Sequence, residues 1–107
     1  MTPAELLRKA RALLEMQNHW TKRAFALNAE GYVTDPTGND AVCWCSVGAI
    51  RRVAGGAHRT AVIESTNALT ACLSGRYISE FNDDPNTTHA DVLAMFDRAI
   101  ARAETKQ

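Results

Sequence analysis

The run AVCWCSVGAIRRVA, residues 41–54, is apolar over most of its length and follows a polar, turn-rich stretch. A helix without a clean polar face is usually buried, so this run predicts the helix around which the rest of the chain packs. Gly55 and Gly56 would end it, and Arg51 and Arg52 suit the negative end of its dipole. No other segment constrains the fold as strongly.

Two amphipathic helices are predicted near the ends of the sequence. The capping-box pair Thr2 and Glu5 predicts a first helix over about residues 3–17, with proline at its first position. Thr88 and Asp91 repeat the capping-box spacing. Both signals are followed by apolar residues at helical spacing, so each helix should bury one face.

The middle of the chain is less sharply patterned. A helix is predicted over about residues 60–74, followed by a link over residues 76–85. In residues 18–41, bulky side chains alternate with small or polar ones, so a short β-hairpin is one option there. The sequence therefore predicts a mainly α fold. It is a single domain over residues 1–107, a compact bundle of about four helices with the stripes of the first and last helices against the central one.

Composition narrows the function classes. The formal net charge is zero, which argues against a general nucleic-acid or membrane binder. The N-terminus has no apolar signal-peptide core, and no stretch reaches transmembrane length. The three cysteines are an odd number, and reduced thiols in a cytoplasm are the natural interpretation.

Charge is unevenly distributed along the chain. Residues 77–97 contain no Lys or Arg and carry the acids Glu80, Asp83, Asp84, Asp91 and Asp97. Arg51, Arg52, His58 and Arg59 lie close together elsewhere. One interpretation is a dipolar surface with two solvated faces. The other is self-association or docking of a protein partner, for which the candidate residues are Glu80, Asp83, Asp84, Arg51 and Arg52.

Cys45 is the most plausible nucleophile. Cys43 and Cys45 would lie in the opening turns of the predicted helix, where the dipole favours a thiolate. A cysteine hydrolase also needs an imidazole and a group that orients it. His89 could supply the first, and Asp91 or Asn82 the second. The alternative is that Cys45 is a small apolar core residue.

Metal and cofactor signals are weak. Cys43 and Cys45 would point about 200° apart on a helix and could not share one ion. The histidines are scattered at His19, His58 and His89. Residues 46–49 and 55–56 match neither a Walker nor a dinucleotide fingerprint. No metal and no cofactor are therefore predicted.

Gly48 lies inside the predicted helix, where glycine costs roughly 1 kcal/mol relative to alanine. It predicts close approach by another helix or by a ring such as Trp20, or alternatively a small ligand beside Gly48. The aromatic residues near this helix could also stack bases next to Lys22, Arg23, Arg51 and Arg52. Zero net charge argues against this nucleic-acid interpretation.

Three segments taken together resemble a known family. They are residues 19–26 (HWTKRAFA), residues 43–50 (CWCSVGAI) and residues 81–92, which begin FND and end TTHADV. Their order resembles a family of small domains of unknown function encoded in bacterial and bacteriophage genomes. The resemblance implies a compact bacterial or phage cytoplasmic protein and implies no catalytic residue.

Two functions follow from these patterns. The preferred one is a small cytoplasmic, non-enzymatic interaction module, such as a mobile-element factor that binds a host protein or itself. The alternative is a cysteine-dependent hydrolase or transferase that uses Cys45 and His89.

Overall fold

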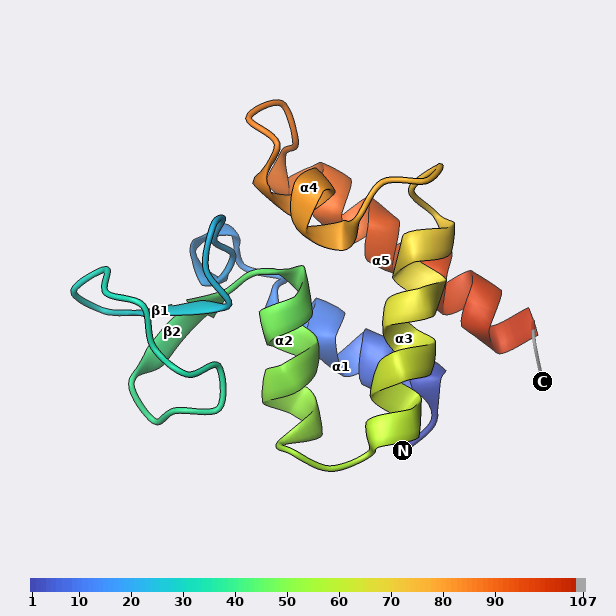
Figure 1. The fold of residues 1–107 in the computed structure, drawn as a ribbon, viewed down its shortest axis with the longest axis horizontal. Helices are drawn as coiled ribbons and strands as arrows, with labels where there is room; N and C mark the ends of the chain where they lie inside the picture. Colours follow the sequence, from blue (N-terminus) through green and yellow to red (C-terminus); the bar gives the residue numbers. More distant parts are fainter. Residues whose placement is uncertain (106–107) are drawn as a thin grey trace.

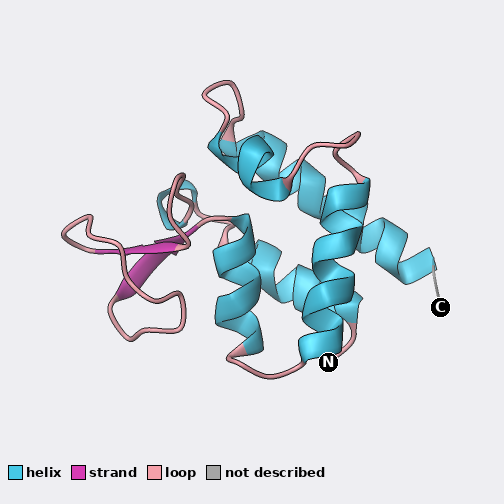
Figure 2. Ribbon diagram, viewed as in Figure 1, coloured by secondary structure: helices cyan, strands magenta, loops and turns pink. Residues whose placement is uncertain are grey.

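Helices form most of the chain, and a short two-stranded sheet lies at one side of them (Figure 1, Figure 2). The structure is a computed structural model that describes residues 1–105. Its elements are α1 (Pro3–Leu13), the 3-10 helix η1 (Gln17–His19), β1 (Ala26–Asn28), β2 (Ala41–Trp44), α2 (Ser46–Ala54), α3 (Arg59–Ala71), α4 (Ile78–Asp83) and α5 (His89–Thr105). The predicted mainly α class, with a hairpin between the first two long helices, is confirmed. None of the helices in this range combines the length and apolar character needed to cross a lipid bilayer.

The helices pack in two crossing pairs. α3 crosses α1 and α5, α2 crosses α1, and α1 contacts α2, α3 and α5 (Figure 1). The buried face of α1 includes Leu6, Leu7 and Ala10, which have no exposed surface. α2 contacts α1, α3 and α4, as expected for a central helix. The expectation that the last helix also packs on α2 is wrong, because α5 packs mainly against α1 and α3.

The first helix begins as predicted and ends early. Thr2 Oγ1 accepts a hydrogen bond from the Glu5 amide (3.2 Å), which completes the capping box. The helix stops at Leu13 instead of continuing to residue 17. A ring nitrogen of His19 lies 3.3 Å from the Leu13 carbonyl oxygen, and one of His89 lies 2.6 Å from that of Leu14. These imidazoles satisfy carbonyl groups that a longer helix would have used.

The segment predicted to open the buried helix is a strand. β2 pairs antiparallel with β1, with Leu27 opposite Cys43 and a bulge that leaves Val42 unpaired. Cys43 therefore lies on a strand and not in a helix. The prediction was wrong at residues 41–44 because their main chain bonds to a partner strand remote in sequence, and local apolar character cannot show such pairing.

α2 begins at Ser46, with Cys45 as its N-cap residue. The Cys45 sulfur accepts a hydrogen bond from the Gly48 amide (3.3 Å). Asp40, which would cap a helix that began at residue 41, instead accepts a hydrogen bond from the Thr34 hydroxyl (2.7 Å). Gly55 ends the helix in the left-handed region (φ 61°), which glycine adopts without strain.

The second half of the chain holds one more helix than predicted. α3 lies within about three residues of its predicted bounds, and α5 begins after the predicted Thr88 cap, where the Thr88 hydroxyl accepts from the Asp91 amide (3.1 Å). The link over residues 76–85 contains the short helix α4, whose Ile78 is buried. The described part of the chain therefore has five α-helices.

Gly48 is needed because the hairpin approaches α2 at this point. A Cβ atom at residue 48 would lie 1.9 Å from the carbonyl oxygen of Phe25. The same oxygen accepts a hydrogen bond from the Cys45 amide (3.2 Å). The predicted close approach to Gly48 is thus made by the Phe25 main chain and not by Trp20. That main chain also fills the space where a ligand beside Gly48 was predicted.

Gly48→Ala tests this contact, because the contact and helix propensity predict opposite changes in the free energy of unfolding. Helix propensity alone would raise the free energy of unfolding by about 1 kcal/mol. We expect instead a loss of about 1–3 kcal/mol, because the new methyl group must displace main chain. Urea denaturation followed by far-UV circular dichroism measures the difference. A more stable variant would show that the Phe25 main chain does not press on this position.

Candidate functional site

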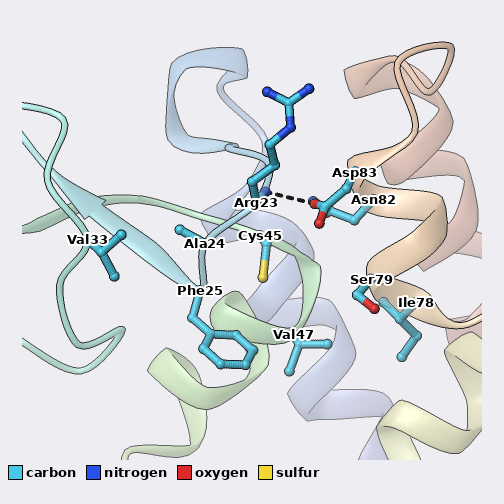
Figure 3. A pocket seen from close by; sticks show the side chains of 10 residues that line it. All are labelled: Arg23, Ala24, Phe25, Val33, Cys45, Val47, Ile78, Ser79, Asn82 and Asp83. Carbon is cyan, nitrogen blue, oxygen red and sulfur yellow. Dashed lines mark hydrogen bonds between the residues drawn. The ribbon is translucent and has the colours of Figure 1, made fainter.

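A pocket of about 320 Å³ opens where the start of the hairpin, the start of α2 and α4 meet (Figure 3). Most of its wall is apolar, and a few polar groups lie among the apolar ones. The lining residues are Arg23, Ala24, Phe25, Val33, Cys45, Val47, Ile78, Ser79, Asn82 and Asp83. A concave apolar site with a small number of polar groups is the usual form of a binding site.

The walls of the pocket come from separate elements of the chain. Phe25 precedes β1 and is held there by the contact between its carbonyl group and α2. Val47 lies in the first turn of α2, and Ile78 begins α4. Val33 comes from the loop between the strands, where it forms an isolated bridge with Leu27. The pocket is therefore a product of tertiary packing.

Cys45 lines this pocket, but its environment does not favour a thiolate. Its side chain is half-buried, and its sulfur points toward the wall formed by Phe25 and Val47 (Figure 3). Burial raises the pKa of the Cys45 thiol above its ordinary value, and the negative charge of Asp83 acts in the same direction. Hydrogen bonds from main-chain amides oppose these effects without overcoming them. The expected lowering by the helix dipole is therefore not found at Cys45.

The other three candidate catalytic residues lie in three different places. Asn82 lines the pocket with Cys45. His89 lies against the end of α1, with one ring nitrogen at the Leu14 carbonyl oxygen and its ring 6.0 Å from that of Trp20. Asp91 accepts a hydrogen bond from the Thr88 amide (3.0 Å) in the cap of α5. The structure thus brings together Cys45 and Asn82, and places His89 and Asp91 in other contacts.

Asn82 is a buried structural link. Its side-chain oxygen accepts hydrogen bonds from the Trp20 indole (2.9 Å), the Ser46 amide (3.0 Å) and the Ser46 hydroxyl (2.7 Å). Its amide nitrogen donates to the Thr21 carbonyl oxygen (3.1 Å) and to Asp83 (3.0 Å). Only 1% of the residue is exposed. This one side chain ties α4 to the start of α2 and to the segment after η1.

The three acidic binding candidates lie on α4 and at its C-terminal end, and all of them make hydrogen bonds within the fold. Glu80 accepts from the Tyr77 amide (3.0 Å), and Asp84 pairs with Arg76 (3.0 Å). Asp83 accepts from the Arg23 amide (2.8 Å). Of the three, only Asp83 lines the pocket.

The two arginine candidates point in different directions from the end of α2. Arg51 is exposed, and its guanidinium lies over the ring of Phe25 at 4.3 Å from the centroid. Arg52 is half-buried and donates to the carbonyl oxygens of Gly38 (2.7 Å) and Pro36 (3.3 Å). Arg52 therefore holds the loop between the strands, whereas Arg51 covers the outer face of Phe25.

The aromatic residues considered for base stacking are partly engaged within the fold. Trp44 is 5% exposed, and its indole donates to the Pro36 carbonyl oxygen (2.9 Å). Trp20 is bonded to Asn82. Phe25 and Tyr32 remain exposed on the hairpin. Among residues 1–105, no three His, Cys, Asp or Glu side chains gather in a way that could hold a metal ion.

Sequence patterns did not identify Val33, Val47, Ile78 and Ser79 as site residues. Each lies on a different segment from Phe25 and reaches the pocket only through packing. The one local signal was the alternation of Phe25 and Leu27 with small residues, which predicted the hairpin but not the cavity beside it.

The raised pKa of Cys45 predicts slow alkylation. A raised pKa leaves less thiolate at neutral pH, so Cys45 in the folded protein should react with iodoacetamide more slowly than in the urea-unfolded chain. Its rate should rise mainly above pH about 8.5, the ordinary thiol pKa. Peptide mapping by mass spectrometry measures the rate at Cys45 across this range. Faster reaction in the folded protein at neutral pH would indicate an activated nucleophile.

Asn82→Ala should destabilise the fold strongly. The change leaves the Trp20 and Ser46 donors without their acceptor in a buried place, which should lower the free energy of unfolding by about 2–4 kcal/mol. Asn67→Ala, at an exposed position on α3, is the matched control and should change stability little. Urea denaturation of both variants makes the comparison. Equal effects would show that the Asn82 bonds do not hold the segments together.

Comparison with known proteins identifies one family. Residues 1–102 match the family described as "Family of unknown function (DUF6197)". No curated protein and no solved structure matches the chain. Because the family match spans nearly the whole chain, the protein belongs to the DUF6197 family of unknown function.

Proposed function

We propose that this protein is a non-enzymatic interaction module, and that the pocket beside the hairpin receives one anchor side chain of a protein partner. The observation that carries the proposal is an apolar pocket whose rim includes exposed Phe25 and Val33. The exposed fractions of these two residues are 45% and 74%. Large exposed apolar residues around a cavity mark interaction sites.

The size of the pocket supports a side chain as its occupant. A volume of about 320 Å³ is at the lower end of the range of about 300–1,000 Å³ for small-molecule sites. Protein interfaces commonly depend on a few anchor residues that fill pockets of this kind. Tyr32, which is 71% exposed next to Val33, extends the apolar surface beyond the pocket itself.

The environment of Cys45 supports binding over catalysis. Its thiol pKa is raised by burial, and the imidazole of His89 is directed to a carbonyl group of α1. A cysteine nucleophile needs the opposite arrangement, with a lowered pKa or an adjacent base.

The proposal includes a cytoplasmic location and an origin in a bacterial or bacteriophage genome. Cys43, Cys45 and Cys72 are free thiols, a form that persists in reducing compartments. The bacterial or phage origin is supported by the resemblance of residues 19–26, 43–50 and 81–92 to domains encoded in such genomes.

Site-specific photo-crosslinking tests the proposal. A photoreactive amino acid is placed at Val33 or at Ser79, both on the pocket rim, and at exposed Thr70 on α3 as the control. In extracts of the organism that carries the gene, we expect a discrete adduct from the two rim positions and none from Thr70. Mass spectrometry of the adduct then distinguishes a second copy of this chain from another protein.

The pocket itself is tested by competition. Excess unlabelled protein should suppress the adduct, whereas excess Ser79→Trp, which fills the mouth of the pocket, should not. Thr70→Trp should compete as well as the unmodified protein. Adducts that form equally from all three positions, or competition by Ser79→Trp, would contradict a role for the pocket.

A further inference from the structure

Asp83 places a carboxylate with a free oxygen at the edge of the pocket. One oxygen, Oδ1, accepts hydrogen bonds from the Arg23 amide (2.8 Å) and the Asn82 side chain (3.0 Å). Within the described residues, Oδ2 has no hydrogen-bond partner and Asp83 forms no ion pair. The side chain is half-buried, so its charge is less screened than that of a fully exposed acid.

The cations near this carboxylate do not neutralise it. The Arg23 main chain bonds to Asp83, but its guanidinium points away from the pocket (Figure 3). Arg51 stacks on Phe25 and is not among the residues that line the cavity. Arg76 is paired with Asp84.

The charge around the pocket is therefore negative on the side formed by α4. Asp83 lies one helical turn after Glu80. Asp84, the next residue, is paired with Arg76, and the Lys22 ammonium donates to its carbonyl oxygen, so Asp84 adds little to this charge. The field of Asp83 also reaches the pocket interior, where, after burial, it contributes to the raised pKa of Cys45. A positively charged group is the complementary occupant of this edge.

The rest of the cavity wall is mostly apolar. Phe25 lies just before β1, Val47 lies on α2, and Ile78 lies at the start of α4, on the same helix as Asp83. A side chain that suits both parts has an aliphatic stem and a cationic end, and lysine combines these in one unbranched chain.

We propose, building on the proposed function, that the anchor is a lysine side chain in a basic segment of the partner protein. Its methylene groups lie against Phe25, Val47 and Ile78, and its ammonium group binds Oδ2 of Asp83. The acidic side formed by α4 favours further basic residues next to this lysine.

Three matched peptides test the inference. Each has the blocked sequence acetyl-Ala-Ala-X-Ala-Ala-amide, in which X is lysine, norleucine or glutamate. Norleucine keeps the lysine stem without the charge. Binding is measured by titration, followed by the amide chemical shifts of Val33, Val47 and Ser79. The lysine peptide should have the lowest Kd and the glutamate peptide the highest. The Kd for lysine should be about 3- to 5-fold lower than that for norleucine, which is the gain that a single ion pair at the rim supplies. Added salt should reduce the difference.

Asp83→Asn is the variant that removes the charge and keeps an acceptor for the Arg23 amide. In this variant, lysine and norleucine peptides should bind equally. Glu64→Gln, which removes an exposed acid on α3, is the matched control and should keep the order of the three peptides. Unchanged amide shifts away from the pocket confirm that both variants are folded.

The outcomes separate this inference from the proposed function. Norleucine binding as tightly as lysine to the unmodified protein overturns the lysine assignment and leaves an apolar anchor pocket in place. Binding of butylammonium chloride without binding of the lysine peptide overturns the assignment to a partner protein. If no peptide shifts the pocket amides, the anchor pocket itself is contradicted.

Discussion

The buried amide of Asn82 is the interaction on which the arrangement of the pocket depends. Its oxygen and nitrogen hold α4, the start of α2 and the segment after η1 in one place. These are the segments that supply Val47, Ile78 and Arg23 to the cavity. A second contact, between the main chain of Phe25 and Gly48, adds the hairpin to the same assembly. The apolar walls therefore meet because the Asn82 amide between them is fully paired.

The ends of the fold were predictable because their signals are local. The capping boxes at Thr2 and Thr88 fix where α1 and α5 begin, and apolar residues at helical spacing fix which face is buried. The end of α1 was not predictable, since it depends on His89, a residue remote in sequence.

The middle of the chain shows why local patterns fail there. Residues 41–44 are apolar enough for a buried helix, but pairing with β1 makes them a strand. Cys45 then becomes a helix cap, a role more often filled by Ser, Thr, Asp or Asn. The sequence identified Cys45, Asn82 and Asp83 as candidate site residues from their chemistry. Their grouping with Val33 and Val47 is a property of the packed chain that no spacing along the sequence encodes.

In the loop between the strands, residues 36–38 are bonded to the rest of the fold and residues 32–33 are exposed. Arg52 and Trp44 hold the main chain at Pro36 and Gly38, while Tyr32 and Val33 project into solvent. Substitutions at those two positions would change the exposed surface without disturbing the anchored part or the helices beneath. Under the proposed function, relatives that share this scaffold would diverge in what they bind through a few residues of one loop.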